Sequence, residues 1–297
     1  MQLTLGPILG NWPADRFADF YARIADEADI DRVVIGEVVC SKRLPFFADR
    51  IAPAAERLAA AGKQVVFASL GLVTLPRERR QARDATELGG PVEINDLTML
   101  RYLAPGQPFT VGPLVNVYNE GTLGFLAARG ALSVCLPPEL PLASIATLAR
   151  AAPSTGADIE VWGFGRVPLA ISGRCYHARV HGLAKDSCQF VCAQDPDGLE
   201  VDTLDGEPFL AANGVQTLSF TCADALGAVD ALAAAGVARL RLSPQSCDMV
   251  AVARIFRDRC AGRIDPADAT TRLSALLPSM PLSNGFMLGP VGAAHVA

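Results

Sequence analysis

Four of the eight cysteines in the chain are spaced so that they could bind a metal. Three of them, Cys175, Cys188 and Cys192, lie in one short polar stretch, and Cys40 lies far upstream in Glu37-Val-Val-Cys40-Ser-Lys-Arg. Four thiolates can complete the ligand shell of an iron–sulfur cluster or of a tetrahedral zinc ion. If these cysteines converge in the fold, the chain is a metalloprotein, and the presence of iron would make it a redox protein.

The spacing of the three downstream cysteines is moderately specific. It matches neither the ferredoxin run nor a zinc-ribbon pair. Cys188 and Cys192 stand four residues apart, so one helical turn would place both sulfurs on the same side. From geometry alone, scattered thiols buried for packing and a redox disulfide remain the alternatives. Four thiolates would fill every protein-supplied coordination position of the metal site. We therefore expect His177 and His181 to lie beside the ligands or in solvent rather than to bind the metal.

The composition indicates one large, well-packed protein. Hydrophobic residues make up 51% of the 297 residues, charged residues make up 19%, and the formal net charge is −5. This balance supports a substantial core and predicts no general affinity for nucleic acid. We see no signal peptide and no apolar stretch near the ~18 residues of a transmembrane helix. We therefore expect a cytoplasmic protein, in which most of the cysteines are thiols.

Short apolar runs alternate with alanine-rich helical patterns along the chain. This repeated alternation predicts a parallel sheet and, with about eight units, a (β/α)8-type TIM barrel, either complete or slightly broken. A doubly wound open sheet is the alternative. The expected strands are residues 3–9, 32–38, 64–69, 92–95, 109–112, 132–136, 159–164, 217–220 and 239–242. The expected helices are residues 14–27, 45–61, 77–88, 119–129, 142–151, 223–235 and 247–261.

Residues 1–297 are predicted to form a single (β/α)-barrel domain. A cysteine-bearing insertion follows the seventh strand and covers residues 165–214, and residues 278–297 form a C-terminal tail. Chemistry in such barrels gathers where the strands end. Glu37, Asn95 and Asn116 fall at these places and are candidates for substrate binding or catalysis. Strand-end side chains of this type also cap backbone groups, and the sequence does not separate the two roles.

Several motifs of the chain resemble a known family. The resemblance runs from the first strand to the tail, and its most specific part is the cysteine pattern with Cys-Ser-Lys-Arg. The family is that of the collagenase-like peptidases of unknown catalytic type, in the branch that carries iron–sulfur clusters and serves ubiquinone biosynthesis. The motifs are residues 37–43, Glu93-Ile-Asn-Asp96, Gly112-Pro-Leu-Val-Asn-Val-Tyr-Asn119, the cysteine segment, Leu242-Ser-Pro-Gln245 and Asn284-Gly-Phe.

The resemblance implies that Cys40, Cys175, Cys188 and Cys192 are the ligands of a [4Fe-4S] cluster. It also implies an iron–sulfur subunit of an oxygen-independent hydroxylase that acts on the aromatic ring of ubiquinone precursors. Such a subunit would form a heterodimer with a UbiU-like protein. A UbiT-like lipid-binding protein would assist, and prephenate would be the oxygen donor.

Two other functions remain open at this point. The chain could be a non-catalytic partner that relays electrons to a catalytic sibling or supports it as a scaffold, or it could be a zinc-stabilised barrel enzyme. We do not expect a peptidase, because the chain holds three histidines and no His-Glu-x-x-His motif, so it offers neither a hydrolytic triad nor a zinc-peptidase site.

Overall fold

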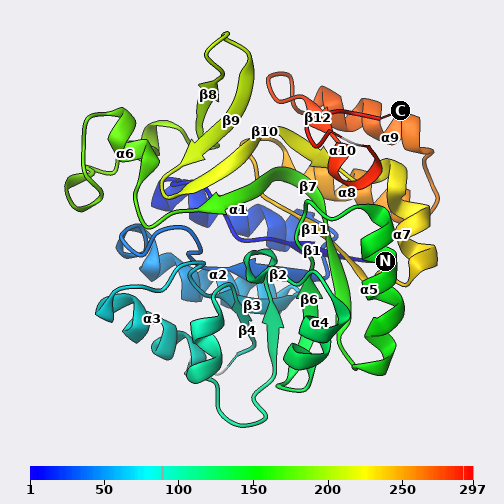
Figure 1. Cartoon of the computed structure of the whole chain (residues 1–297), viewed down its shortest axis with the longest axis horizontal. Coiled ribbons are helices and arrows are strands. Elements are labelled where there is room, and N and C mark those ends of the chain that lie inside the picture. The colour runs from blue at the N-terminus through cyan, green and yellow to red at the C-terminus, as the bar shows by residue number, and fades with distance from the viewer. Residues whose placement is uncertain (88–89, 290, 297) are drawn as a thin grey trace.

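A computed structural model describes residues 1–87, 90–289 and 291–296, and a closed barrel of parallel strands lies at its centre (Figure 1). The final barrel strand pairs in parallel with both the first and the seventh, and this pairing closes the barrel. The predicted (β/α) barrel is therefore confirmed, and the open doubly wound sheet is excluded. The barrel strands are β1 (Gln2–Leu5), β2 (Arg32–Ile35), β3 (Gln64–Ala68), β4 (Val92–Ile94), β5 (Phe109–Val111), β6 (Ala131–Cys135), β7 (Asp158–Ile171) and β11 (Arg239–Leu242).

Helices surround this barrel and bury their apolar sides against it. In α1 the buried side chains Phe17, Tyr21 and Ile24 recur at helical spacing, so one stripe of the helix faces the core. The predicted bounds of α1 and α5 agree with the structure, and the predicted end at Leu88 lies outside the described residues. The surrounding helices are α1 (Ala14–Glu27), α2 (Ala48–Ala60), α3 (Pro76–Thr86), α4 (Glu120–Ala127), α5 (Leu142–Ala151), α7 (Val229–Ala235), α8 (Met249–Cys260) and α9 (Pro266–Ala275).

Strand β7 continues beyond the end of the barrel and begins a second, antiparallel part of the sheet. It pairs with β10 (Gln216–Asp224), which pairs with β9 (Pro208–Asn213), and β9 pairs with β8 (Leu199–Asp202). The expectation that residues 217–220 belong to the parallel sheet was wrong. The chain returns to the exposed edge of β7 without a crossover helix, and such a return produces antiparallel pairing. The β8–β9 hairpin and helix α6 (Tyr176–Val180) project from the barrel in Figure 1.

The tail folds back on itself and against the barrel. Helix α10 (Gly285–Leu288) follows β12 (Leu282–Ser283), which pairs with β10. Asn284 fastens the end of the chain, because its Nδ2 donates to the Val296 oxygen at 2.8 Å and its Oδ1 accepts from the Val296 amide at 2.6 Å. Pro290 and Ala297, which fall within the predicted tail, lie outside the described residues.

The apolar residues form two clusters. The larger fills the barrel and the layer between strands and helices. The smaller covers one end of the barrel and includes Trp162, Val167 and Val215 together with Val38 and Val39 on the loop after β2. Cys40, Cys175 and Cys188 pack in this smaller cluster, so it joins the barrel to the cysteine-bearing segment. No helix within the described part of the chain is both long and apolar enough to cross a membrane.

Candidate functional site

The structure brings the four candidate cysteines together at one end of the barrel. Cys40 lies on the loop after β2, Cys175 directly precedes α6, Cys188 follows the 3-10 turn Lys185–Ser187, and Cys192 lies in the turn Val191–Gln194. All four line a single small cavity of about 20 Å³. That these cysteines bind a metal stays a prediction, and what the structure contributes is their common position around one cavity.

Three of the four sulfurs receive a hydrogen bond from a nitrogen. Such N–H···S contacts stabilise a thiolate and tune the potential of a metal that it holds. The donors are Asn11 Nδ2 to Cys192 at 3.4 Å, the Ala178 amide to Cys175 at 3.4 Å and Lys42 Nζ to Cys188 at 3.5 Å.

Positive charge also gathers around the cavity, where Lys42, Arg43 and Lys185 line its wall. Arg43 is almost fully buried, with 1% of its surface exposed. Its Nη1 donates to the Leu9 oxygen at 2.9 Å and its Nη2 to Asn213 Oδ1 at 2.8 Å, so the guanidinium is rigidly placed. Cations held here offset the negative charge that thiolates bring into a buried site.

Glu37 holds the loop that carries Cys40. Its Oε1 accepts from the Val39 amide at 2.7 Å and from the Cys40 amide at 2.9 Å. Burial raises the pKa of Glu37, and the nearby Arg43 charge and the two amide hydrogen bonds offset part of that rise. Of the two roles that the sequence allows for Glu37, these contacts favour positioning of the backbone.

Burial raises the pKa of the Cys40 and Cys175 thiols. Both groups are therefore protonated near neutral pH when they bind nothing. A metal must displace these protons, because the thiolate is the form that acts as a ligand.

The arrangement of the cysteines can be compared with what a single ion and a cluster each require. In the described ranges, which omit residues 88–89, 290 and 297, no three His, Cys, Asp or Glu side chains are placed to share one metal ion. A zinc ion requires its sulfurs about 2.3 Å from a common centre. A cubane cluster puts its own iron and sulfide between the cysteine sulfurs and so tolerates a wider separation.

The two histidines of the cysteine-bearing insertion, His177 and His181, make contacts that support its structure. The buried His177 has Nε2 at 2.9 Å from Asp195 Oδ2 and Nδ1 at 3.1 Å from the Ala212 oxygen. The ring of His181 stacks on it at a centroid distance of 5.5 Å. Nδ1 of His177 is thus hydrogen-bonded, whereas Nε2 approaches Asp195 without hydrogen-bond geometry in the described part of the chain.

The other two candidate residues are placed differently from each other. Asn95 lines a second cavity, also of about 20 Å³, at the mouth of the barrel. Its Nδ2 lies 3.3 Å from both the Ser69 oxygen and Glu93 Oε1. Asn116 is exposed in a left-handed conformation, with φ 61° and ψ 55°, at the end of the 3-10 turn Pro113–Val115. The structure therefore brings Asn95 to the barrel mouth and leaves Asn116 outside it.

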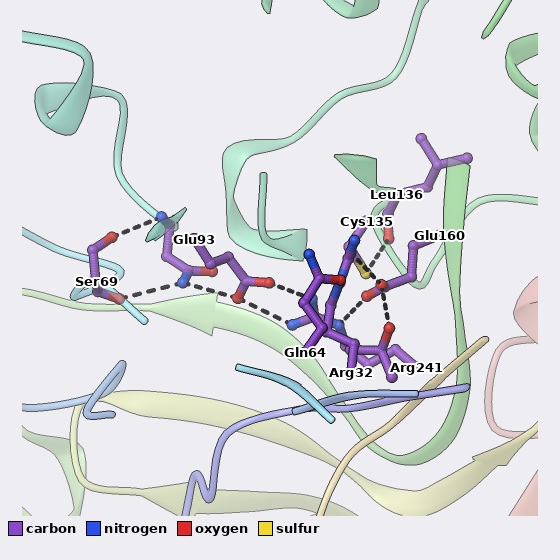
Figure 2. Close-up of polar contacts among 10 residues, drawn as sticks. Arg32, Gln64, Ser69, Glu93, Cys135, Leu136, Glu160 and Arg241 are labelled. Atoms are coloured by element: carbon purple, nitrogen blue, oxygen red, sulfur yellow. Dashed lines mark hydrogen bonds and ion pairs between the residues drawn. The ribbon is translucent and has the colours of Figure 1, made fainter. Parts of the chain in front are cut away.

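A network of buried charges lies inside the barrel (Figure 2), and Asn95 contacts it through Glu93. The Arg241 guanidinium pairs with Glu93 through both terminal nitrogens, and its Nε lies 2.5 Å from Glu160 Oε1. Thr4 Oγ1 donates to Glu160 at 2.7 Å, and Arg32 lies 3.6 Å from the same carboxylate. Burial alone would raise the pKa of Glu160, but the Arg241 and Arg32 charges and the Thr4 hydrogen bond outweigh it and lower that pKa.

Sequence reasoning missed several of these residues. Asn11 and Asn213 carried no local signal, because their partners lie far away in the chain. A local signal did exist for Arg32, Glu160 and Arg241. Each is a charged residue within an apolar strand, and a buried ion pair is the expected explanation for such a residue.

Comparison with known proteins identifies the family. The model of Peptidase family U32 matches residues 16–291, nearly the whole chain. The chain belongs to this family. Among solved structures, it is similar to a truncated form of 3-deoxy-D-arabino-heptulosonate 7-phosphate synthase from Thermotoga maritima. That similarity has a TM-score of 0.30 and 11% sequence identity, and it covers 54% of this chain and 74% of the synthase.

Proposed function

We propose that this U32-family chain is a UbiV-like iron–sulfur subunit of an oxygen-independent hydroxylase that acts on the aromatic ring of ubiquinone precursors. The observation that carries the proposal is the meeting of Cys40 with Cys175, Cys188 and Cys192 around one cavity, with an N–H donor on three of the sulfurs. When bound there, a [4Fe-4S] cluster would supply one-electron chemistry.

The residues around the cavity have distinct tasks in this proposal. The four cysteines hold the cluster, and Glu37 fixes the backbone at Cys40. Lys42 and Arg43 balance the charge of the thiolates, and Asn11 donates to the Cys192 sulfur.

Hydroxylation replaces a ring hydrogen with a hydroxyl group and removes two electrons from the ring. Without molecular oxygen, a donor must supply the oxygen atom and accept those electrons, and we propose prephenate for this role. Two polar groups at the barrel mouth could position a polar reactant. Within the described residues, Gln216 Nε2 and Ser243 Oγ are buried without a hydrogen-bond partner, and both side chains line the mouth cavity.

The small size of the mouth favours a second candidate function. A cavity of about 20 Å³ holds roughly one water molecule. An aromatic ring does not fit there unless the mouth opens, which suits a non-catalytic partner that relays electrons to a catalytic sibling or supports it.

We further propose a UbiU-like protein as the heterodimer partner and a UbiT-like protein as the lipid-binding accessory. Large apolar side chains are exposed on the segments around the cysteines, which supports a partner surface there. Phe46, Tyr176 and Val180 are each about half exposed, and the Phe46 ring packs edge-on against Phe190 at 4.6 Å.

The test is ring hydroxylation under anaerobic conditions in cells that produce this chain together with the UbiU-like partner. Single changes of Glu37, Asn95 and Asn116 to Ala separate the two candidates. The catalytic reading predicts that Asn95→Ala abolishes hydroxylation while the iron content is retained, and that the exposed Asn116→Ala changes little. Full hydroxylation by Asn95→Ala with an intact cluster would favour the non-catalytic role.

A further inference from the structure

A cavity of about 220 Å³ lies beside the barrel, between the carboxyl ends of β2 and β3 and the helices α2 and α3. It is distinct from the barrel mouth and from the space among the cysteines, each of about 20 Å³. An apolar cavity of about 150 Å³ is known to bind benzene. The lateral cavity therefore has room for one benzene ring with small substituents.

Most of the wall is apolar and comes from all four elements and the turns between them. Such a lining favours a flat hydrocarbon ring over a sugar or a phosphate. The apolar lining residues are Ile35, Leu44, Ile51, Phe67, Leu70, Ala82 and Ala85.

Four polar side chains, Glu37, Ser69, Gln81 and Asp84, also border the cavity. Ser69 Oγ accepts from the Asn95 amide at 2.9 Å, and Asp84 is exposed, so Glu37 and Gln81 are the inward candidates for a ligand contact. Glu37 Oε1 already accepts two backbone amides, whereas Oε2 has no hydrogen-bond partner among the described residues. The Gln81 amide likewise has no partner in the described part of the chain, and its Oε1 is buried. Glu37 Oε2 is therefore an acceptor without a partner, and Gln81 Oε1 is one that is also buried, so the site offers acceptors to a hydrogen-bond donor that a ligand would supply.

From this arrangement we infer that the lateral cavity binds a monocyclic phenol. The ring lies among the apolar side chains, and its hydroxyl group donates to Glu37 Oε2. A methyl ether or an unsubstituted ring of the same size fills the space but leaves the carboxylate oxygen without a donor. The inference does not depend on the proposed function, because binding of the phenol requires no cluster and no catalysis.

The site has a direct connection to the cysteines. The carboxylate that receives the phenol is the one that holds the Cys40 amide at 2.9 Å. Occupancy of the cavity and the conformation of the Cys40 loop are therefore linked through a single side chain.

The test is calorimetric titration of the purified protein with 4-methylphenol, 4-methylanisole and toluene. Loss of a charge-assisted hydrogen bond predicts binding of 4-methylanisole and toluene about tenfold or more weaker than that of 4-methylphenol. Glu37→Gln, which replaces the free acceptor with a donor, should remove this preference for the phenol and leave toluene binding unchanged. Equal affinity for the three ligands would overturn the inference.

A filled-cavity variant provides an independent check. Ala85→Leu places a larger side chain in the cavity and should abolish binding of all three ligands. The matched control Ala59→Leu makes the same change on the exposed side of α2 and should bind as the wild type does. Undiminished binding by Ala85→Leu would place the ligand elsewhere and overturn the inference.

The variants Ala85→Leu and Ala59→Leu also show whether the bound phenol is the hydroxylase substrate or a separate effector. If the ring belongs to the hydroxylase substrate, Ala85→Leu loses ring hydroxylation together with binding. If the phenol is a separate effector, binding is lost while hydroxylation continues.

Discussion

Replacement of Arg241 by Met should reverse the pH dependence of stability within the barrel. Arg241, Glu93 and Glu160 have side chains that are at most 3% exposed, and the guanidinium pairs with both carboxylates. Its removal leaves buried carboxylates without their main partner, which costs about 3–5 kcal/mol near neutral pH. Glu160 then binds a proton more readily, because the charge that held its pKa down is gone.

The sign of the pH effect follows from the pKa of Glu160. In the wild type this pKa is lowered, so the stabilisation is fully present above the ordinary carboxyl pKa and is lost as the pH falls from there through the lowered pKa of the folded state. In Arg241→Met the pKa is raised, so the free energy of unfolding should increase as the pH falls from about 7.5 to about 5.5.

Urea unfolding at the two pH values measures this directly. The control Arg239→Met, on the same strand, removes a 3.8 Å ion pair with Asp158, whose side chain is 54% exposed, and should cost only about 1 kcal/mol. The reasoning is refuted if Arg241→Met costs no more than the control, or if acidification fails to restore part of its stability.

Three further predictions follow from individual contacts. Glu37→Ala should lower the iron content of anaerobically purified protein, whereas Glu37→Gln keeps an acceptor for the amide of the cysteine loop and should retain more iron. Gly112→Ala would place a Cβ 1.9 Å from Asn95 Oδ1 and should destabilise the protein by about 1–3 kcal/mol in thermal unfolding, whereas Gly124→Ala meets nothing within 4 Å and should not. Lys42→Met removes a positive charge and a hydrogen bond from a cysteine sulfur, and it should make the midpoint potential in a redox titration more negative.

Local patterns were enough to predict the barrel. The apolar spacing in α1 and the alanine-rich run of α5 gave helix bounds that the structure confirms, because both helices bury one continuous stripe. Helix α9 was missed although Asp265 caps it and Pro266 begins it, since few large apolar residues mark its buried side.

The antiparallel extension could not be predicted in the same way. Nothing local to β7 says that the strand leaves the barrel, and Pro168 within it argues against a continuous strand. Its partner β10 lies some 50 residues later, and the register between them shifts twice. Pairing of this kind depends on the fold as a whole rather than on periodicity.

For the candidate site, the sequence predicted that the four cysteines lie close together, but not which residues hold them in place. Cys40 follows one barrel strand and Cys175 follows another, and the carboxyl ends of parallel strands share one end of the barrel. The contact of Asn11 with the Cys192 sulfur joins segments that are distant in sequence, so no local pattern could predict it. The sequence offered Glu37 as a substrate-binding candidate, and only the structure shows that it holds the Cys40 amide.

Iron and acid-labile sulfide analysis of anaerobically purified protein tests the central claim most directly. The wild type should contain about four iron atoms and four sulfides per chain. Cys188→Ala should lose most of both, whereas Cys247→Ala, which changes a partly buried cysteine outside the cavity, should retain them. A full complement of iron in Cys188→Ala, or zinc in place of iron in the wild type, would contradict the account.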